Sequence, residues 1–189
     1  MIKKGKRITV EKETDENTRE YPSASVLVEV VLNQYGNELS RGSSIDDKAN
    51  IFIGAVIAAL TIFLPSIPYS GIKEYLLDHK ECNCGIVGLL IVLIISLILI
   101  VFAFVYLYKT VRVRGYSTPK ISSITSEEAL ENNENNTQAA LVKHYKKVIE
   151  DLEKINSDKA DSLELGIKLA VISFLLMLIA TVCINFIVL

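Results

Sequence analysis

The residue patterns that mark most enzymes are absent from this sequence. It contains only two histidines, His79 and His144, and no H-E-x-x-H pair that could hold a catalytic zinc ion. A glycine-rich phosphate loop and the G-x-S-x-G motif of serine hydrolases are also missing. We therefore expect that this protein is not an enzyme and that it uses no cofactor.

Charged residues are also absent from three long apolar runs, which cover residues 51–69, 85–108 and 169–189. Each run is close to the roughly 20 residues that cross a bilayer as a helix, and in lipid only a helix pairs its own backbone groups. We therefore predict an all-α membrane protein with three transmembrane helices, at residues 50–69, 85–108 and 166–189.

Ionisable side chains are missing from these predicted spans, apart from Lys168 near the start of the third. Carriers and pumps normally place such groups, or broken helices, inside the membrane to bind substrate and protons. A secondary transporter is therefore not expected.

Basic residues are scarce in the predicted loop at residues 70–84, which carries only Lys73 and Lys80 of the chain's 20 Lys and Arg. Because basic flanks stay in the cytoplasm, we place residues 1–49 and 109–165 there, and the loop and the C-terminus outside. The abundance of Ile, Lys and Asn favours a bacterial inner membrane. The lipid bilayer is an expected partner, and nucleic acid is not.

Two helices are predicted before the first span. Residues 1–21 are too polar to offset the entropy of ordering, whereas residues 23–39 place apolar side chains near helical spacing. Those side chains are Val26, Leu27, Val30, Val31 and Leu39. We expect Gly42 to end this amphipathic helix and a second one to start near Ser44, which stands three residues before Asp47 as in a capping box. The second helix should continue into the first span.

A longer helix is predicted before the third span, after a solvated linker at residues 115–136. Its apolar positions recur at alternating steps of four and three, as in a coiled coil. They are Leu141, Tyr145, Val148, Leu152 and Ile155, with Lys159 at the next position. This seam either packs on the helix at residues 23–39 of the same chain or associates with a second copy. The helix should continue into the third span.

Arg112 and Arg114 alternate with valines directly after the second span. We expect either a short strand or, by preference, a continued helix whose arginines reach the lipid headgroups. Together with Lys143 and Lys147, these cations either attract anionic lipid or bind a phosphorylated small ligand.

Small residues distinguish the three spans from one another. Gly54 and Ala58 in the first, and Ala170 and Ser173 in the third, have spacings that let a neighbouring helix approach closely. We therefore predict that the first and third spans pack together through these residues. The second span is almost unbroken Ile, Leu and Val and is expected to face lipid.

Cys82 and Cys84 lie in the predicted external loop, where oxidation is permitted. A bridge between cysteines two residues apart is strained, so an intrachain disulfide, bridges to a second subunit and free thiols all stay open. His79 is a third potential metal ligand nearby, but no second group completes a tetrahedral set. No metal site is predicted.

Charged and amide side chains stand at the predicted cytosolic boundary of the spans. Asp46 and Lys48 precede the first span, and Asn156 and Lys159 precede the third. Because partial desolvation strengthens charge pairing, we hypothesise that Asp46 bonds Lys159 or Asn156 and ties the first span to the third in a resting state. The alternative is that these are boundary charges that only set the orientation.

Two stretches lead into the first and last spans with a distinctive pattern. SSIDDKANIFIGAVIAAL contains Asp46, Lys48 and Ala49, and HYKKVIEDLEKINSDKADSLELGIKLAV contains Tyr145, Asn156 and Lys159. In these residues, and in the order of spans, polar insertion and final helix over residues 25–189, the chain resembles the Pycsar-type transmembrane effectors of bacterial antiphage defence.

This resemblance implies an effector that stays silent until a partner cyclase makes a cyclic nucleotide, such as cyclic UMP or cyclic CMP. Nucleotide binding would then drive membrane disruption and stop the growth of the infected cell. Three spans without internal charges cannot line a pore as one chain, so a homo-oligomer is expected. A noncatalytic accessory or scaffold subunit of a bacterial membrane complex, and a holin-like pore former, are the alternatives.

Overall fold

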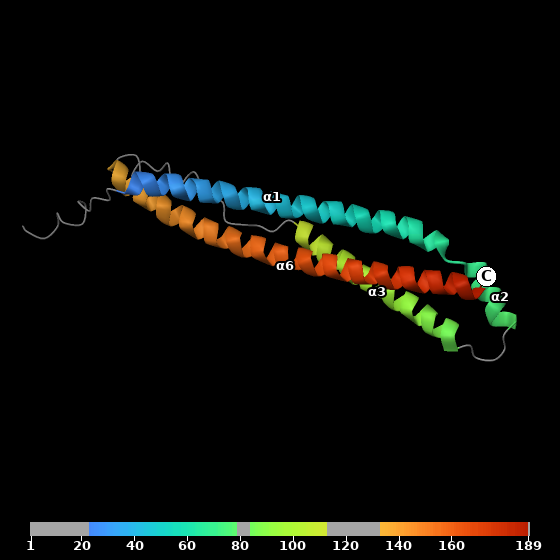
Figure 1. Cartoon of the computed structure of the whole chain (residues 1–189). Helices are drawn as coiled ribbons and strands as arrows, with labels where there is room; N and C mark the ends of the chain where they lie inside the picture. Colours follow the sequence, from blue (N-terminus) through green and yellow to red (C-terminus); the bar gives the residue numbers. More distant parts are fainter. Residues whose placement is uncertain (1–22, 79–83, 113–132, 189) are drawn as a thin grey trace, which may run out of the picture. The chain divides into compact units, whose positions relative to one another are not determined.

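The computed structural model describes residues 23–78, 84–112 and 133–188, which form helices and contain no strand (Figure 1). In chain order the elements are α1 (Ala24–Phe63), the short 3-10 helix η1 (Leu64–Ser66), α2 (Tyr69–Asp78), α3 (Cys84–Val111) and α6 (Glu134–Val188). Three of them, α1, α3 and α6, are long and apolar enough to cross a membrane. The predicted fold class, an all-α membrane protein with three transmembrane helices, is confirmed.

α1 is a single helix of 40 residues, so the predicted break at Gly42 and restart near Ser44 are wrong. A glycine inside a helix costs only about 1 kcal/mol relative to alanine, and contacts made by the helix can outweigh that cost. α6 is likewise continuous, over 55 residues. The predictions that helices lead without a break into the first and third apolar runs are therefore confirmed.

Two prolines separate α1 from α2. α1 gives way to η1, which contains Pro65, and α2 starts directly after Pro68. Proline cannot donate a backbone hydrogen bond to the preceding turn, which explains the end of the long helix. α2 was not foreseen, and it occupies much of the predicted loop at residues 70–84.

The polar segment between α3 and α6 is bounded by helix ends that the sequence prediction placed differently. α3 continues past the apolar run to Val111, and the backbone amide of Arg112 still donates to the backbone oxygen of Tyr108 at 3.0 Å, whereas Arg114 lies outside the described residues. α6 begins after Asn133, whose side-chain oxygen accepts a hydrogen bond from the backbone amide of Asn135 at 3.3 Å. This is the bond by which an asparagine caps a helix N-terminus.

The chain divides into two compact units, and the first comprises residues 1–37 and 116–151. Within this unit the ring of Tyr35 on α1 meets the ring of Tyr145 on α6 edge to face, with centroids 5.4 Å apart. The seam of α6 therefore packs on α1 of the same chain, which was one of the two predicted alternatives.

The amphipathic face of α1 in this unit was predicted only in part. Ala24 is buried and Tyr35 is half-buried, and they are eleven residues apart, close to three full turns, so both lie on one face of the helix. Of the apolar residues chosen from the sequence, Val31 is half-buried one turn before Tyr35, and Leu27 lines a groove beside Ala24. Val26 and Val30 are exposed, at 62% and 57%, and were predicted wrongly.

The second unit comprises residues 38–115 and 152–189 and contains the three apolar runs. Its main core gathers buried residues of all three long helices. They are Ile45, Ala49 and Val56 of α1, Ala103 and Leu107 of α3, and Leu163 and Ala170 of α6. Phe63 of α1 also stacks on Phe174 of α6, with centroids 6.1 Å apart. The first and third spans do pack together, as predicted.

The residues of the first span that make this contact are not the predicted ones. Gly54 and Ala58 are exposed, and no atom lies within 4 Å of a methyl group built on Gly54. Two small residues four positions apart show that another helix can approach closely, but they do not identify that helix. The predicted role of Gly54 and Ala58 in packing is therefore not fulfilled within the chain.

The second span is not a purely lipid-facing helix, which corrects the prediction. The Ser173 hydroxyl of α6 donates a hydrogen bond to the backbone oxygen of Ser96 on α3, at 2.9 Å, and both residues are fully buried. A methyl group on Gly166 would come within 3.0 Å of the Leu107 side chain. The small residues of the third span thus bring α6 close to α3.

We expect Gly166→Ala and Gly54→Ala to have opposite effects on stability. Gly166→Ala forces its new methyl group against Leu107 and should lower the free energy of unfolding by about 1–3 kcal/mol. Gly54→Ala meets open space and should be neutral or stabilising by up to about 1 kcal/mol, through helix propensity. Thermal unfolding of the full chain in detergent micelles measures both, and equal destabilisation by the two would contradict this packing.

Candidate functional site

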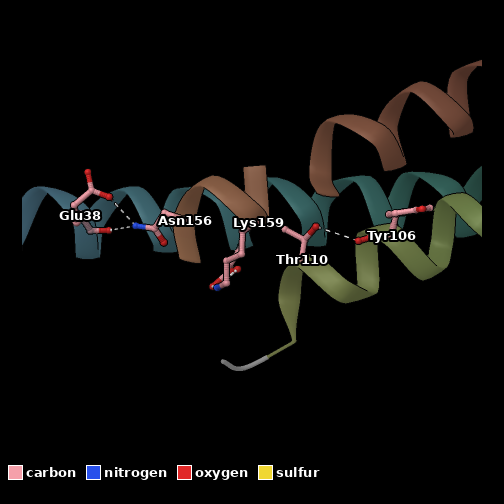
Figure 2. Close-up of polar contacts among 6 residues, drawn as sticks. Glu38, Tyr106, Thr110, Asn156 and Lys159 are labelled. Atoms are coloured by element: carbon pink, nitrogen blue, oxygen red, sulfur yellow. Dashed lines mark hydrogen bonds and ion pairs between the residues drawn. The ribbon is translucent and has the colours of Figure 1, made fainter. Parts of the chain in front are cut away.

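A polar contact joins α1 to α6 within the second unit, just before both helices enter their apolar runs. On α1 its residues follow each other at steps of four, as Glu38, Gly42 and Asp46, and so share one face. On α6 they are Asn156 and Lys159. Figure 2 shows Asn156 reaching Glu38, with Lys159 one turn farther along α6.

Lys159 and Asp46 form the ionic part of this contact. The Lys159 ammonium donates hydrogen bonds to both carboxylate oxygens of Asp46, each at 2.8 Å. The Lys159 side chain is only 10% exposed, and that of Asp46 is 33% exposed. Removing an ammonium from water costs free energy unless it is paired and hydrogen-bonded, and Asp46 supplies that partner. Of the two partners hypothesised for Asp46, Lys159 is the one that pairs with it in the structure.

Asn156 makes the second part of the contact, with a residue that the sequence prediction missed. Its amide nitrogen donates to the backbone oxygen of Glu38 at 2.8 Å and to the Glu38 carboxylate at 2.9 Å. Glu38 is 7% exposed and also lies 3.5 Å from the Arg41 guanidinium. Its spacing of eight residues from Asp46 was the available signal, but a glutamate on an amphipathic helix usually indicates a solvated face.

Gly42 lies on α1 at the point where the Asn156 side chain approaches the helix most closely. A methyl group at Gly42 would lie 2.9 Å from the amide oxygen of Asn156, closer than real side chains approach. The glycine therefore gives the Asn156 amide the room that it needs beside α1. The sequence prediction took the same residue for a helix end, because local preference carries no information about the opposite helix.

Asn156 and Lys159 occupy a heptad seam that runs along α6. Steps of three and four from Leu152 pass through buried positions along the whole of this helix in the second unit, which are Leu152, Asn156, Lys159, Leu163, Gly166, Ala170, Ser173, Met177, Ala180 and Ile184. Ser162 and Thr181 are buried beside this seam. Polar residues in such a seam lower stability but specify one register, because any other alignment leaves them unpaired. The contact therefore determines how α6 aligns with α1.

The other predicted site residues lie at the surface. Lys48, Arg112, Lys143 and Lys147 are all exposed. Lys143 lines a small, mainly apolar groove of about 180 Å³ in the first unit, together with Ser23, Ala24, Leu27, Ala139 and Val142. None of these four cations is buried as Lys159 is.

Lys168 and Glu164 form a second ion pair on α6, which contrasts with the first. The Lys168 ammonium donates to the Glu164 carboxylate one turn away, and both side chains are about two-thirds exposed. This hydrogen bond, followed by the charge of Lys168, lowers the pKa of Glu164 below its usual value. Since water screens an exposed pair, its contribution to stability is small.

Cysteines and metal ligands add no further site to the described part of the chain. Cys84 is an exposed free thiol at the start of α3, while Cys82 and His79 lie outside the described residues. Within residues 23–78, 84–112 and 133–188, no group of three or more His, Cys, Asp or Glu could hold a metal ion. The polar contact of α1 with α6 is therefore the best-defined candidate site.

Comparison of the chain with protein-family models, with curated proteins and with solved structures finds no match. The short stretches around Asp46 and Lys159, which stand before the first and third apolar runs, form the polar contact.

We expect Lys159→Met to destabilise the chain far more than Lys168→Met. Removing the Lys159 ammonium leaves the Asp46 carboxylate without its partner and should cost about 2 kcal/mol of the free energy of unfolding. Lys168→Met breaks only an exposed pair, which water screens, and should leave it nearly unchanged. Unfolding in micelles, followed by circular dichroism, compares the two, and similar losses would argue against a buried ionic contact.

Gly42→Ala should disrupt the Asn156 half of the contact, and Gly36→Ala on the same helix is the matched control. The new methyl group at Gly42 displaces the Asn156 amide and breaks its bonds to Glu38, at a cost of about 1–2 kcal/mol. Gly36 has no atom near its missing methyl group, so its substitution should not destabilise. A stabilising Gly42→Ala in the same unfolding assay would show that the close approach is not needed.

Proposed function

We propose that this chain is an antiphage defence effector of the bacterial inner membrane, with its N-terminus in the cytoplasm and its C-terminus outside. In this proposal a cyclic nucleotide, cyclic UMP or cyclic CMP from a partner cyclase, converts a silent form into one that disrupts the membrane and arrests the infected cell. The observation that carries the proposal is the Lys159–Asp46 contact, placed where two continuous helices enter the membrane.

This contact has the properties of one state of a switch. The ionic pair is stable while both partners meet, and separating them requires water to hydrate Lys159 and Asp46 individually. An intermediate with partly separated charges is unfavourable, so two discrete arrangements of α1 and α6 are expected. Because each helix continues into an apolar run, a change at the contact is transmitted to the spans.

Assembly explains how spans without charged residues could disrupt a membrane. The outer face of the first span presents Gly54 and Ala58, which are exposed in the described part of the chain and allow a second helix to approach closely. Several copies brought together in this way would deform or open the bilayer, which a single copy of three apolar helices cannot do. The active form is therefore proposed to be a homo-oligomer.

Exposed cations are the proposed receptors of the nucleotide phosphate. Lys143 and Lys147 on α6 are exposed and can contact a charged ligand from solution. Arg112 after α3 is also exposed, and Arg114 lies outside the described residues. Arginine binds a phosphate through two parallel hydrogen bonds, and lysine acts as a point charge. Binding at these cations would favour the arrangement of the helices that best fits the ligand.

A scaffold or accessory subunit is the second candidate, and one observation favours it. Val26, Leu27 and Val30 form an apolar, exposed surface on the part of α1 that precedes the predicted span. Such surfaces often bind another protein. This candidate predicts no membrane leakage under any condition, while a holin-like pore former predicts leakage without a nucleotide.

Dye leakage from lipid vesicles tests the proposed activity. We expect vesicles that contain the full chain to release dye when cyclic UMP or cyclic CMP is added, and to stay intact with the linear nucleotides UMP and CMP. The linear nucleotides serve as controls because they supply the same base, sugar and phosphate without the cyclic phosphodiester. If no nucleotide changes either leakage or thermal unfolding, the effector proposal fails.

Asp46→Ala tests the proposed switch separately from ligand binding. Without the Asp46 carboxylate the resting contact is weakened, so we expect leakage or oligomer size in the absence of nucleotide to rise above that of the natural chain. Asp47→Ala is the matched control, because Asp47 is exposed one residue away and outside the contact. Unchanged leakage and unchanged oligomer size in Asp46→Ala would refute this role.

A further inference from the structure

An open pocket of about 320 Å³ lies between the C-terminal end of α3 and the face of α6 next to its seam. Its lining residues are Tyr106 and Lys109 of α3, and Asp158, Asp161, Ser162 and Leu165 of α6. The volume is at the lower end of the range of about 300–1,000 Å³ that small-molecule sites occupy.

The level of this pocket relative to the membrane follows from the end of one apolar run and from one helix contact. The apolar run of α3 ends just before Lys109, and Gly166, near the start of the third apolar run, packs against Leu107. The ends of the two runs therefore lie side by side. The pocket contains residues on both sides of this level, so it opens at the boundary between hydrocarbon and water.

The charges in the pocket are of both signs. Lys109 supplies a cation from α3, while Asp158 and Asp161 supply carboxylates from α6. A bare metal ion would be repelled by the Lys109 ammonium, and an anion would be repelled by the two carboxylates. A ligand that carries a primary ammonium and a phosphate on one short linker satisfies both sets, through charge-assisted hydrogen bonds.

Apolar lining indicates the source of such a ligand. Leu165 is 41% exposed beside the pocket, and the half-buried ring of Tyr106 lies at the level where acyl chains begin. A soluble zwitterion would leave this apolar surface in water, whereas a lipid would cover it with its glycerol and acyl groups. We propose that this pocket binds the headgroup of phosphatidylethanolamine.

In this assignment the lipid ammonium lies beside Asp161, and its phosphate faces Lys109. Phosphatidylglycerol has no ammonium for the carboxylates. Phosphatidylcholine has a quaternary ammonium that cannot donate a hydrogen bond. The pocket should therefore select phosphatidylethanolamine over both, which distinguishes it from the general attraction of surface cations to anionic lipid.

Native mass spectrometry of the full chain tests this selection. The chain is released from detergent micelles to which one lipid at a time has been added. We expect phosphatidylethanolamine to be retained about fivefold more than phosphatidylglycerol of identical acyl chains, the factor that about one charge contact at a membrane surface supplies. Equal retention of the two lipids would overturn the proposal, and this comparison needs no variant.

Asp161→Asn and Glu164→Gln then locate the binding. Asp161→Asn should abolish most of the preference for phosphatidylethanolamine, whereas Glu164→Gln, which removes a carboxylate just outside the pocket, should keep it. Equal losses in both variants would show that only overall charge matters. Soluble phosphoethanolamine should compete only weakly with the lipid, and strong competition would overturn the assignment to a membrane lipid.

Discussion

A lysine that is nine-tenths removed from water must have an anion beside it, and this constraint sets the relation of α1 to α6. The Lys159 ammonium meets Asp46 at 2.8 Å, and one turn earlier the Asn156 amide meets Glu38. Both contacts require the same alignment of the two helices. A slip of one turn would leave a buried ammonium and a buried amide unpaired, at a cost that apolar packing alone would not impose.

The sequence contained enough to predict the spans and one ion pair, but not how the helices face one another. The absence of charge over three runs identified the spans, and the positions of Asp46 and Lys159 before them suggested their pairing. Gly42 was taken for a helix end and Gly54 for a contact with the third span, and both predictions were wrong. A glycine in the sequence shows that a neighbour can approach closely, but not which neighbour does so. Gly42 turned out to be approached by Asn156, and Gly54 by no residue of the described chain.

The second span shows the same limit in another form. In lipid every face of a helix is apolar, so hydropathy does not separate the packed face of α3 from the exposed ones. Ser96 and Ala103 stand among Ile, Leu and Val in this span. They are seven residues apart on one face, and both are fully buried in the structure. Their spacing was the signal for packing.

Two faces of α6 thus meet different partners over a few residues. Lys159 turns toward Asp46 on α1, whereas its neighbour Asp158 lines the pocket beside Tyr106 on α3. A rotation of α6 that separates Lys159 from Asp46 would also change the shape of that pocket. The proposed switch and the proposed lipid site would therefore influence each other through a single rigid helix.

The most direct test of the central claim is a distance between α1 and α6 measured in lipid. Spin labels are placed through Ser43→Cys and Ser157→Cys, two exposed positions beside the contact, in a chain whose Cys82, Cys84 and Cys183 are replaced by serine. Double electron–electron resonance should give one narrow distance distribution, which broadens and shifts when Lys159→Met is added. An identical distribution with and without Lys159 would contradict the account.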